Sequence, residues 1–129
     1  MNHILLPDGR GSDLISKSHG TNAMELLINA LLRRGAERER LRAKLFGGAR
    51  MIAGLSDIGE ANSVFVEEFC RRESIPCVAS SLRGDTGRRI QFWPVTGKAR
   101  QQFLRNVSDI PEVAPPIAAK SSGSEVELF

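Results

Sequence analysis

Residues 43–52 read Ala-Lys-Leu-Phe-Gly-Gly-Ala-Arg-Met-Ile, an apolar run that breaks into two adjacent glycines. Such a run predicts a buried strand ending in a tight bend, where the backbone turns or passes close to another segment. Two adjacent glycines are also typical of a plain β-turn, and both interpretations stay open. Helical patterns precede and follow the run, so both neighbours are expected to pack on the sheet that contains it.

Amphipathic helices are predicted on both sides of this run. In residues 23–34, apolar side chains recur at helical spacing, at positions 23, 24, 27, 28, 31 and 32. Thr21 or Asn22 is the expected N-cap of this helix, and Gly35 is the expected C-cap. The same spacing predicts a second helix that begins after a cap at residue 56 or 57 and ends near residues 72–74.

Strands are expected at residues 1–6, 75–82 and 89–95. The last of these alternates polar and apolar side chains, and the glycine-containing turn before it predicts a hairpin with residues 75–82. We expect residues 99–107 to form one further short element and the glycine-rich residues 8–20 to form a surface loop. Helices alternating with strands, plus one antiparallel hairpin, predict the α+β class, a layered single domain with a mixed sheet flanked by helices.

The composition is that of a soluble globular protein, with 129 residues of which 41% are hydrophobic and 26% charged. No stretch approaches the ~20 apolar residues of a membrane-spanning helix. The start has no basic leader, so we expect a cytoplasmic protein without direct membrane insertion. The net charge is +3, but acidic residues interleave with the arginines and aromatic residues are few, which argues against nucleic-acid binding.

The composition changes at residue 108. Prolines and then a run of Ala, Ser and Gly predict a disordered tail over residues 108–129, after a folded domain over residues 1–107. The tail finishes with Glu125-Val126-Glu127-Leu128-Phe129. This acidic and hydrophobic cluster is either a docking peptide on a tether or an unused solvated end.

Few residues carry candidate chemistry. From its context alone, His3 is more typical of a structural residue than of a catalytic one. Cys70 and Cys77 are too few for a disulfide scaffold and too far apart for a redox pair, so both are expected to be small apolar residues inside the fold. Residues 84–89 form either an anion cradle or a hairpin turn with solvated arginines. His3 and His19 lack the spacing of metal ligands, and we expect no metal and no other cofactor.

Several stretches, taken in order, resemble one family, the chemoreceptor glutamine deamidases of bacterial chemotaxis (CheD). They are Met-Asn-His at residues 1–3 followed by Leu-Leu-Pro, Asn-Ala-Met-Glu-Leu-Leu-Ile at 22–28, the glycine-containing run at 43–49, Asp-Ile-Gly-Glu-Ala-Asn at 57–62, and Gly-Asp-Thr-Gly-Arg-Arg at 84–89 with Thr-Gly-Lys at 96–98. Each stretch is weak alone, whereas the ordered set is specific and covers residues 1 to about 100. The resemblance implies a layered fold of the cysteine-hydrolase type.

The resemblance implies an enzyme that hydrolyses glutamine side-chain amides in the cytoplasmic domains of methyl-accepting chemotaxis receptors, giving glutamate and ammonia. Members of the family also act on glutamyl methyl esters of these receptors. The implied mechanism is papain-like, with a cysteine nucleophile and a histidine base. His3, in its Met-Asn-His context, matches the family's histidine and is the candidate catalytic base. The chemotaxis phosphatase CheC is a further implied partner.

The chain departs from the family at the nucleophile. The family's cysteine lies in a Gly-Ser-Cys turn before the Met-Asn-His segment, and neither Cys70 nor Cys77 matches that position. We expect the nucleophile and the N-terminal strands of the domain to lie upstream of Met1, because a strand at Met1 needs partners. The alternative, from a different functional class, is a catalytically silent chemotaxis module that binds its partners without releasing ammonia.

Overall fold

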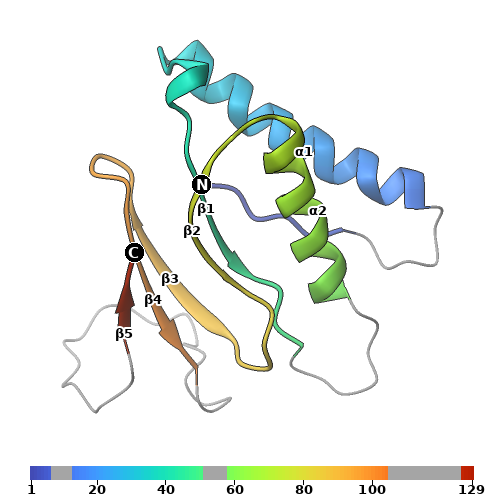
Figure 1. The fold of residues 1–129 in the computed structure, drawn as a ribbon, viewed down its shortest axis with the longest axis vertical. Coiled ribbons are helices and arrows are strands. Elements are labelled where there is room, and N and C mark those ends of the chain that lie inside the picture. Colours follow the sequence, from blue (N-terminus) through green and yellow to red (C-terminus); the bar gives the residue numbers. More distant parts are fainter. Residues whose placement is uncertain (7–12, 51–57, 105–125) are drawn as a thin grey trace, which may run out of the picture. The chain divides into compact units, whose positions relative to one another are not determined.

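The computed structural model describes residues 1–6, 13–50, 58–104 and 126–129 (Figure 1). Contacts divide the chain into two units, Met1–Asp85 and Thr86–Phe129, which we call the first and the second unit. The boundary expected between residues 107 and 108 lies outside the described residues.

The first unit contains both α-helices and a parallel pair of strands. Its elements are α1 (Asp13–Arg33), the short 3₁₀-helix η1 (Arg38–Arg40), β1 (Ala43–Gly47), α2 (Ile58–Arg72) and β2 (Cys77–Leu82). β1 and β2 run parallel, with Ala43 opposite Cys77 and Gly47 opposite Leu82. Parallel strands need a long crossover connection, and α2 supplies it. β1 confirms a strand at the start of residues 43–52, although it is half-buried rather than buried, and residues 51–52 lie outside the described residues. β2 confirms the strand predicted at 75–82. Residues 1–6 form no strand, so that prediction is wrong.

Helix α1 begins ten residues before its predicted start, at Asp13. Glycines suggested a loop over residues 8–20, but Gly20 lies inside the helix. A Cβ atom at Gly20 would lie 2.7 Å from the Leu6 side chain and 2.7 Å from the Phe65 ring. Gly20 therefore permits close packing, which offsets its low intrinsic preference for a helix.

Both helices end in the same hydrogen-bonding pattern. After α1, Gly35 has φ +91° and donates its N–H to the carbonyl of Leu32, while Ala36 donates to the carbonyl of Leu31. This pattern is a Schellman motif and confirms the predicted C-cap. After α2, Ile75 donates to the carbonyl of Cys70, and Ser74 takes the left-handed position at φ +54°.

Replacing Ser74 with glycine is expected to stabilise the first unit by about 1 kcal/mol, because a left-handed conformation is strained for a residue with a Cβ atom. Urea unfolding followed by circular dichroism measures the change. Ser80→Gly is the matched control, because glycine inside strand β2 is expected to destabilise the unit by about 0.5–1 kcal/mol. A Ser74→Gly variant no more stable than the parent chain would contradict the prediction.

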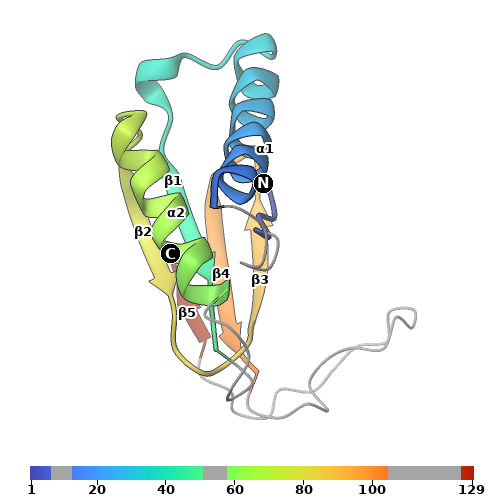
Figure 2. The same cartoon turned by 90° about the vertical axis from the view of Figure 1, so that its right-hand side faces the viewer.

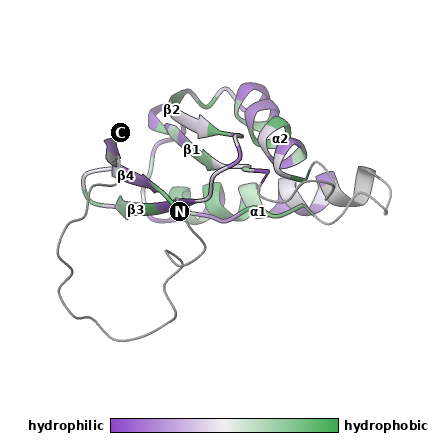
Figure 3. Cartoon of the chain, turned by 90° about the horizontal axis from the view of Figure 1, so that it is seen from below, coloured by the Kyte–Doolittle hydropathy of each residue, from purple (hydrophilic) through white to green (hydrophobic). Residues whose placement is uncertain are grey.

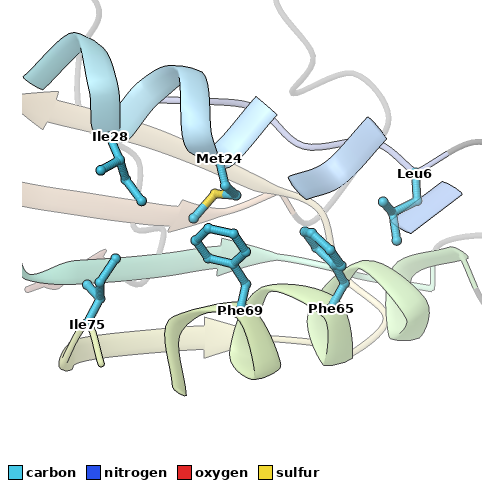
Figure 4. Close-up of a cluster of buried hydrophobic side chains, with 6 residues drawn as sticks. All are labelled: Leu6, Met24, Ile28, Phe65, Phe69 and Ile75. Atoms are coloured by element: carbon cyan, nitrogen blue, oxygen red, sulfur yellow. The ribbon is translucent and has the colours of Figure 1, made fainter. Parts of the chain in front are cut away.

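The hydrophobic core of the first unit draws its side chains from α1 and α2, whose course Figure 2 shows, and from Leu6 and Ile75 outside the helices. Figure 4 shows Phe65 and Phe69 projecting from α2 toward Met24 of α1, with Leu6 near one end of the cluster. Phe69 is 1% exposed, and its ring centroid lies 6.2 Å from that of Phe65. Along both helices hydrophobic and hydrophilic stretches alternate (Figure 3). The apolar spacing read from residues 23–34 thus identified the core face at Met24 and Ile28, whereas Leu31 is exposed.

The second unit is an antiparallel sheet of β3 (Arg88–Trp93), β4 (Lys98–Phe103) and β5 (Val126–Leu128), in the order β3-β4-β5. The predicted hairpin between residues 75–82 and 89–95 is wrong, because β3 pairs with β4. A tight turn explains the difference: Gly97 has φ +68° and donates its N–H to the carbonyl of Trp93 at 2.8 Å. Two helices and a parallel pair of strands in the first unit, and an antiparallel sheet in the second, confirm the α+β class.

The prediction of a disordered tail is wrong for the last residues of the chain, which form strand β5. Val126–Leu128 pair with β4, and Phe129 exchanges two backbone hydrogen bonds with Ala99, at 2.9 and 3.1 Å. The remainder of that predicted tail lies outside the described residues. The acidic and hydrophobic end of the chain is thus docked on its own sheet.

Candidate functional site

The segment that holds His3 is attached to both helices of the first unit. The Asn2 side chain donates a hydrogen bond to the carbonyl of Ala23 in α1, at 2.9 Å. At the other end, the Leu6 N–H donates to the Asn62 side chain of α2, also at 2.9 Å. The His3 residue itself is exposed to solvent.

The carboxyl ends of β1 and β2 meet the first half of α2. The Arg83 N–H donates to the carbonyl of Gly47 at 2.8 Å, and the Arg50 N–H donates to the carbonyl of Gly84 at 2.7 Å. These bonds join the segments that follow the two strands. Ligands of sheets with parallel strands bind outside the carboxyl ends of those strands. This end of the first unit is therefore the candidate site, and Asn62 links it to the segment of His3.

Glycines allow the backbone to approach α2 closely at this end. Gly48 has φ +69°, and a Cβ atom there would collide with the Ser63 hydroxyl and lie 2.8 Å from the Gly59 carbonyl oxygen. Ser63 is 1% exposed and donates its hydroxyl to that same carbonyl at 2.8 Å. Of the two interpretations of the paired glycines, the structure therefore favours close approach to another segment.

Arg83 connects the end of β2 to two carboxylates of α2. Its guanidinium donates to both oxygens of Glu60, at 3.1 and 2.8 Å, and to both oxygens of Glu67, at 3.0 and 2.8 Å. The hydrogen bonds from Arg83 lower the pKa of Glu67, and the two carboxylates raise the pKa of Arg83. Sequence reasoning missed this cluster, because Glu60 and Glu67 lie on a helix that is distant in sequence from Arg83, and no local pattern pairs them.

Acid is expected to destabilise the first unit through Glu67. Because folding lowers the pKa of this carboxyl below 4.5, its contribution is complete above pH 4.5 and is lost as pH falls through the folded-state pKa. Urea unfolding midpoints compared at pH 7 and at pH values below 4.5 measure this loss. Glu67→Gln is expected to reduce the acid dependence, whereas Glu68→Gln, on the same helix, is not. Equal effects of the two substitutions would refute the assignment.

The two cysteines lie in different environments. Cys70 is buried, which raises the pKa of its thiol, and the neighbouring Cys77 raises it further. Cys77 is exposed, and its thiol donates to the carbonyl of Ala79 at 3.2 Å. The apolar placement predicted for both is thus confirmed for Cys70 and wrong for Cys77. Both line an open pocket of about 690 Å³, with Ser80 and the acidic Glu67 and Glu68.

Metal ligands do not gather in the described part of the chain. Among those residues, no group of three histidine, cysteine or acidic side chains is placed to hold a metal ion. The described helices also include none long and apolar enough to cross a membrane.

Comparison with known proteins gives one consistent result. A family model described as CheD chemotactic sensory transduction matches residues 5–102. Proteins named "Probable chemoreceptor glutamine deamidase CheD" match the whole chain, with 56% identity in Acidiphilium cryptum, 48% in Caulobacter vibrioides and 45% in Cereibacter sphaeroides. The chain spans 72%, 72% and 65% of these relatives, respectively.

Proposed function

Because the chain belongs to the CheD family of chemotactic sensory transduction proteins, we propose that it acts in glutamine deamidation of chemoreceptors. The proposed reaction hydrolyses the side-chain amide of a receptor glutamine to a glutamate carboxylate and ammonia. The observation that carries the proposal is the family match over residues 5–102, together with relatives at 43–56% identity that are named for this activity. The cytoplasm is the proposed location, since receptor signalling domains are presented there.

His3 is the proposed general base. Its exposed imidazole stands on a segment held at Asn2 and at Leu6, so the ring is accessible while its backbone is positioned by both helices. The base takes the proton from a cysteine thiol, and the thiolate attacks the amide carbon. The imidazolium then gives that proton to the leaving ammonia. Water, deprotonated by the same imidazole, releases glutamate from the thioester.

Neither described thiol is well suited to be the nucleophile. An attacking cysteine needs a thiolate, and burial raises the pKa of Cys70 and so disfavours that form. The Cys77 thiol is hydrogen-bonded to the Ala79 carbonyl beside it. We therefore propose that His3 acts with a thiol other than those of Cys70 and Cys77.

The test uses the protein isolated from its own cells, incubated with a purified receptor cytoplasmic fragment. Ammonia release and the conversion of receptor glutamine to glutamate, followed by peptide mass spectrometry, measure the activity. Intact mass and thiol alkylation of the same sample identify any reactive cysteine outside residues 1–129. Glutamine conversion that is abolished by alkylation supports the proposal, and an absence of conversion with a competent receptor fragment overturns it.

A second candidate, a catalytically silent binding module, is favoured by the unreactive placement of Cys70. Its proposed partners are the receptor fragment and the phosphatase CheC. This function predicts that the isolated protein binds a partner, measured by calorimetry, while it releases no ammonia from the receptor. Binding accompanied by ammonia release would reject it in favour of the deamidase.

A further inference from the structure

The second unit holds its own C-terminal strand as a peptide ligand is held. β5 adds to the edge of β4, with Leu128 opposite Arg100, Glu127 opposite Gln101 and Val126 opposite Gln102 (Figure 1). This arrangement is strand addition, in which the main chain provides affinity and alternate side chains provide specificity. Two side chains of the docked end, those of Glu127 and Phe129, fall on one face of the sheet by this register.

Glu127 makes the specific polar contact of the docked strand. Its carboxylate accepts a hydrogen bond of 2.9 Å from the Gln101 side chain, and Gln101 is fully buried. Arg88 of β3 interacts electrostatically with Glu127. Burial lowers the pKa of this arginine, and the negative charge of the Glu127 carboxylate opposes that shift. The Arg88 guanidinium also lies over the Phe103 ring, 5.2 Å from its centroid. The sheet therefore presents an amide and a cation to an incoming carboxylate.

The strands that receive β5 are basic. β3 and β4 read Arg-Arg-Ile-Gln-Phe-Trp and Lys-Ala-Arg-Gln-Gln-Phe, which contain arginine and lysine but no acidic residue. Figure 3 shows hydrophilic stretches on both strands. The end of the chain, Glu-Val-Glu-Leu-Phe, is acidic and apolar. This charge complementarity selects an acidic extended segment and disfavours a basic one.

The connection between β4 and β5 is much longer than their pairing requires. Gln102 and Val126 are opposite each other, so about two to five residues would join the strands in a hairpin. Residues 104–125 separate the two strands instead. The three-residue strand β5 therefore pairs with β4 at an effective concentration that the connecting length sets, and a separate segment that binds the same edge competes with it.

We propose that the β4 edge of the second unit is a binding site for an extended acidic segment of a partner protein, and that β5 occupies this site as a tethered competitor. The partner segment has the order apolar, acidic, apolar, aromatic that Val126–Phe129 display. The carboxylate of the partner segment takes the place of the Glu127 carboxylate beside Gln101 and Arg88. Its backbone takes the place of the β5 backbone in the hydrogen-bonded ladder with β4. Peptide binding and ammonia release are measured independently, so the failure of this proposal is distinguishable from the failure of the deamidase proposal.

The test uses a fluorescent peptide with the sequence of residues 121–129, titrated into the full chain and followed by anisotropy. Glu127→Lys in the chain weakens the competitor, so the peptide is expected to bind that variant about tenfold or more tightly than the parent chain. The same change placed in the peptide is expected to weaken its binding to the variant by a similar factor. Glu68→Lys, in the first unit, matches the charge change and is expected to leave peptide binding unchanged.

The proposal is supported if Glu127→Lys has opposite effects in the two molecules. Peptide binding then becomes stronger when the substitution is in the chain and weaker when it is in the peptide. Peptide binding to Glu127→Lys that is equal to or weaker than binding to the parent overturns it, because β5 is then only a structural strand. Formation of concentration-dependent dimers by the variant also overturns it and assigns the edge to a second copy.

Hydrogen exchange provides a second measurement that needs no variant. The Phe129 amide donates to Ala99 in the β5 ladder, whereas the Leu104 amide donates to Gly87 beside the β3–β4 ladder. If β5 leaves the edge while β3 and β4 stay paired, the Phe129 amide exchanges at least about tenfold faster than the Leu104 amide. Exchange of Phe129 as slow as that of Leu104 overturns the proposal, because β5 then opens only together with the rest of the sheet.

Discussion

Replacing His3 with alanine is expected to lower the rate of receptor glutamine deamidation by about 10²- to 10⁴-fold, the range that general base catalysis contributes. The imidazole is the proposed acceptor of the thiol proton, and alanine leaves the thiol without a base. The segment itself stays attached, because Asn2 and Leu6 make its two hydrogen bonds to the helices. The measurement is the initial rate of ammonia release from a receptor fragment.

His19 provides the matched control, since it is the other histidine of the chain and is exposed on α1. His19→Ala is expected to leave the rate within about twofold of the parent, because a surface substitution away from a site has little effect on it. Circular dichroism of both variants checks that the fold is intact. A His3→Ala protein that retains the parent rate would remove His3 from the proposed mechanism.

The sequence predicts the core of the first unit well because apolar spacing carries the information. Met24 and Ile28 recur at helical spacing and are both buried, as is Phe69 in the second predicted helix. Gly20 shows where this reasoning stops. Its effect on the helix depends on contact with Leu6 and Phe65, which are distant in sequence, so local preference alone predicts a loop there.

Strand pairing was harder to predict than strand position. β2 and β3 were both expected near their observed positions, but β2 pairs in parallel with β1, and β3 pairs with β4. The tight turn at Gly97 favours the β3–β4 hairpin, whereas pairing of β2 with β1 depends on the crossover through α2. β5 was not predicted, because the preceding residues are rich in Pro, Ser and Gly and because the strand forms only by pairing with the β4 edge.

At the candidate site, too, sequence reasoning found some residues and missed others. His3 was selected by resemblance, and its role stays a prediction. Arg83 was not selected, although it holds Glu60 and Glu67 together. Its two partners lie on a different element, and a surface arginine beside a turn gives no signal in the sequence of where its side chain goes. Sequence reasoning therefore missed the features that depend on contacts between different elements, whereas it found those that depend on the residue pattern within one element.

Gly48→Ala is expected to destabilise the first unit by about 2–5 kcal/mol. A left-handed backbone contributes about 1–2 kcal/mol of this change, because Gly48 has φ +69° and alanine carries a Cβ atom. Overlap contributes about 1–3 kcal/mol more, because the new Cβ meets the Ser63 hydroxyl and the Gly59 carbonyl. Urea unfolding followed by circular dichroism measures the total change in the free energy of unfolding. We also expect the substitution to move the carboxyl end of β1 away from α2.

Gly35→Ala separates the two contributions. Gly35 has φ +91° but nothing lies within 4 Å of its Cβ position, so its replacement is expected to show only the conformational part, about 1–2 kcal/mol. In a double-mutant cycle, Ser63→Ala removes one of the atoms that the new methyl group at position 48 would meet, so the two changes together are expected to destabilise less than their sum. Additive effects, or equal losses at Gly35 and Gly48, would show that close approach to α2 does not require glycine at position 48.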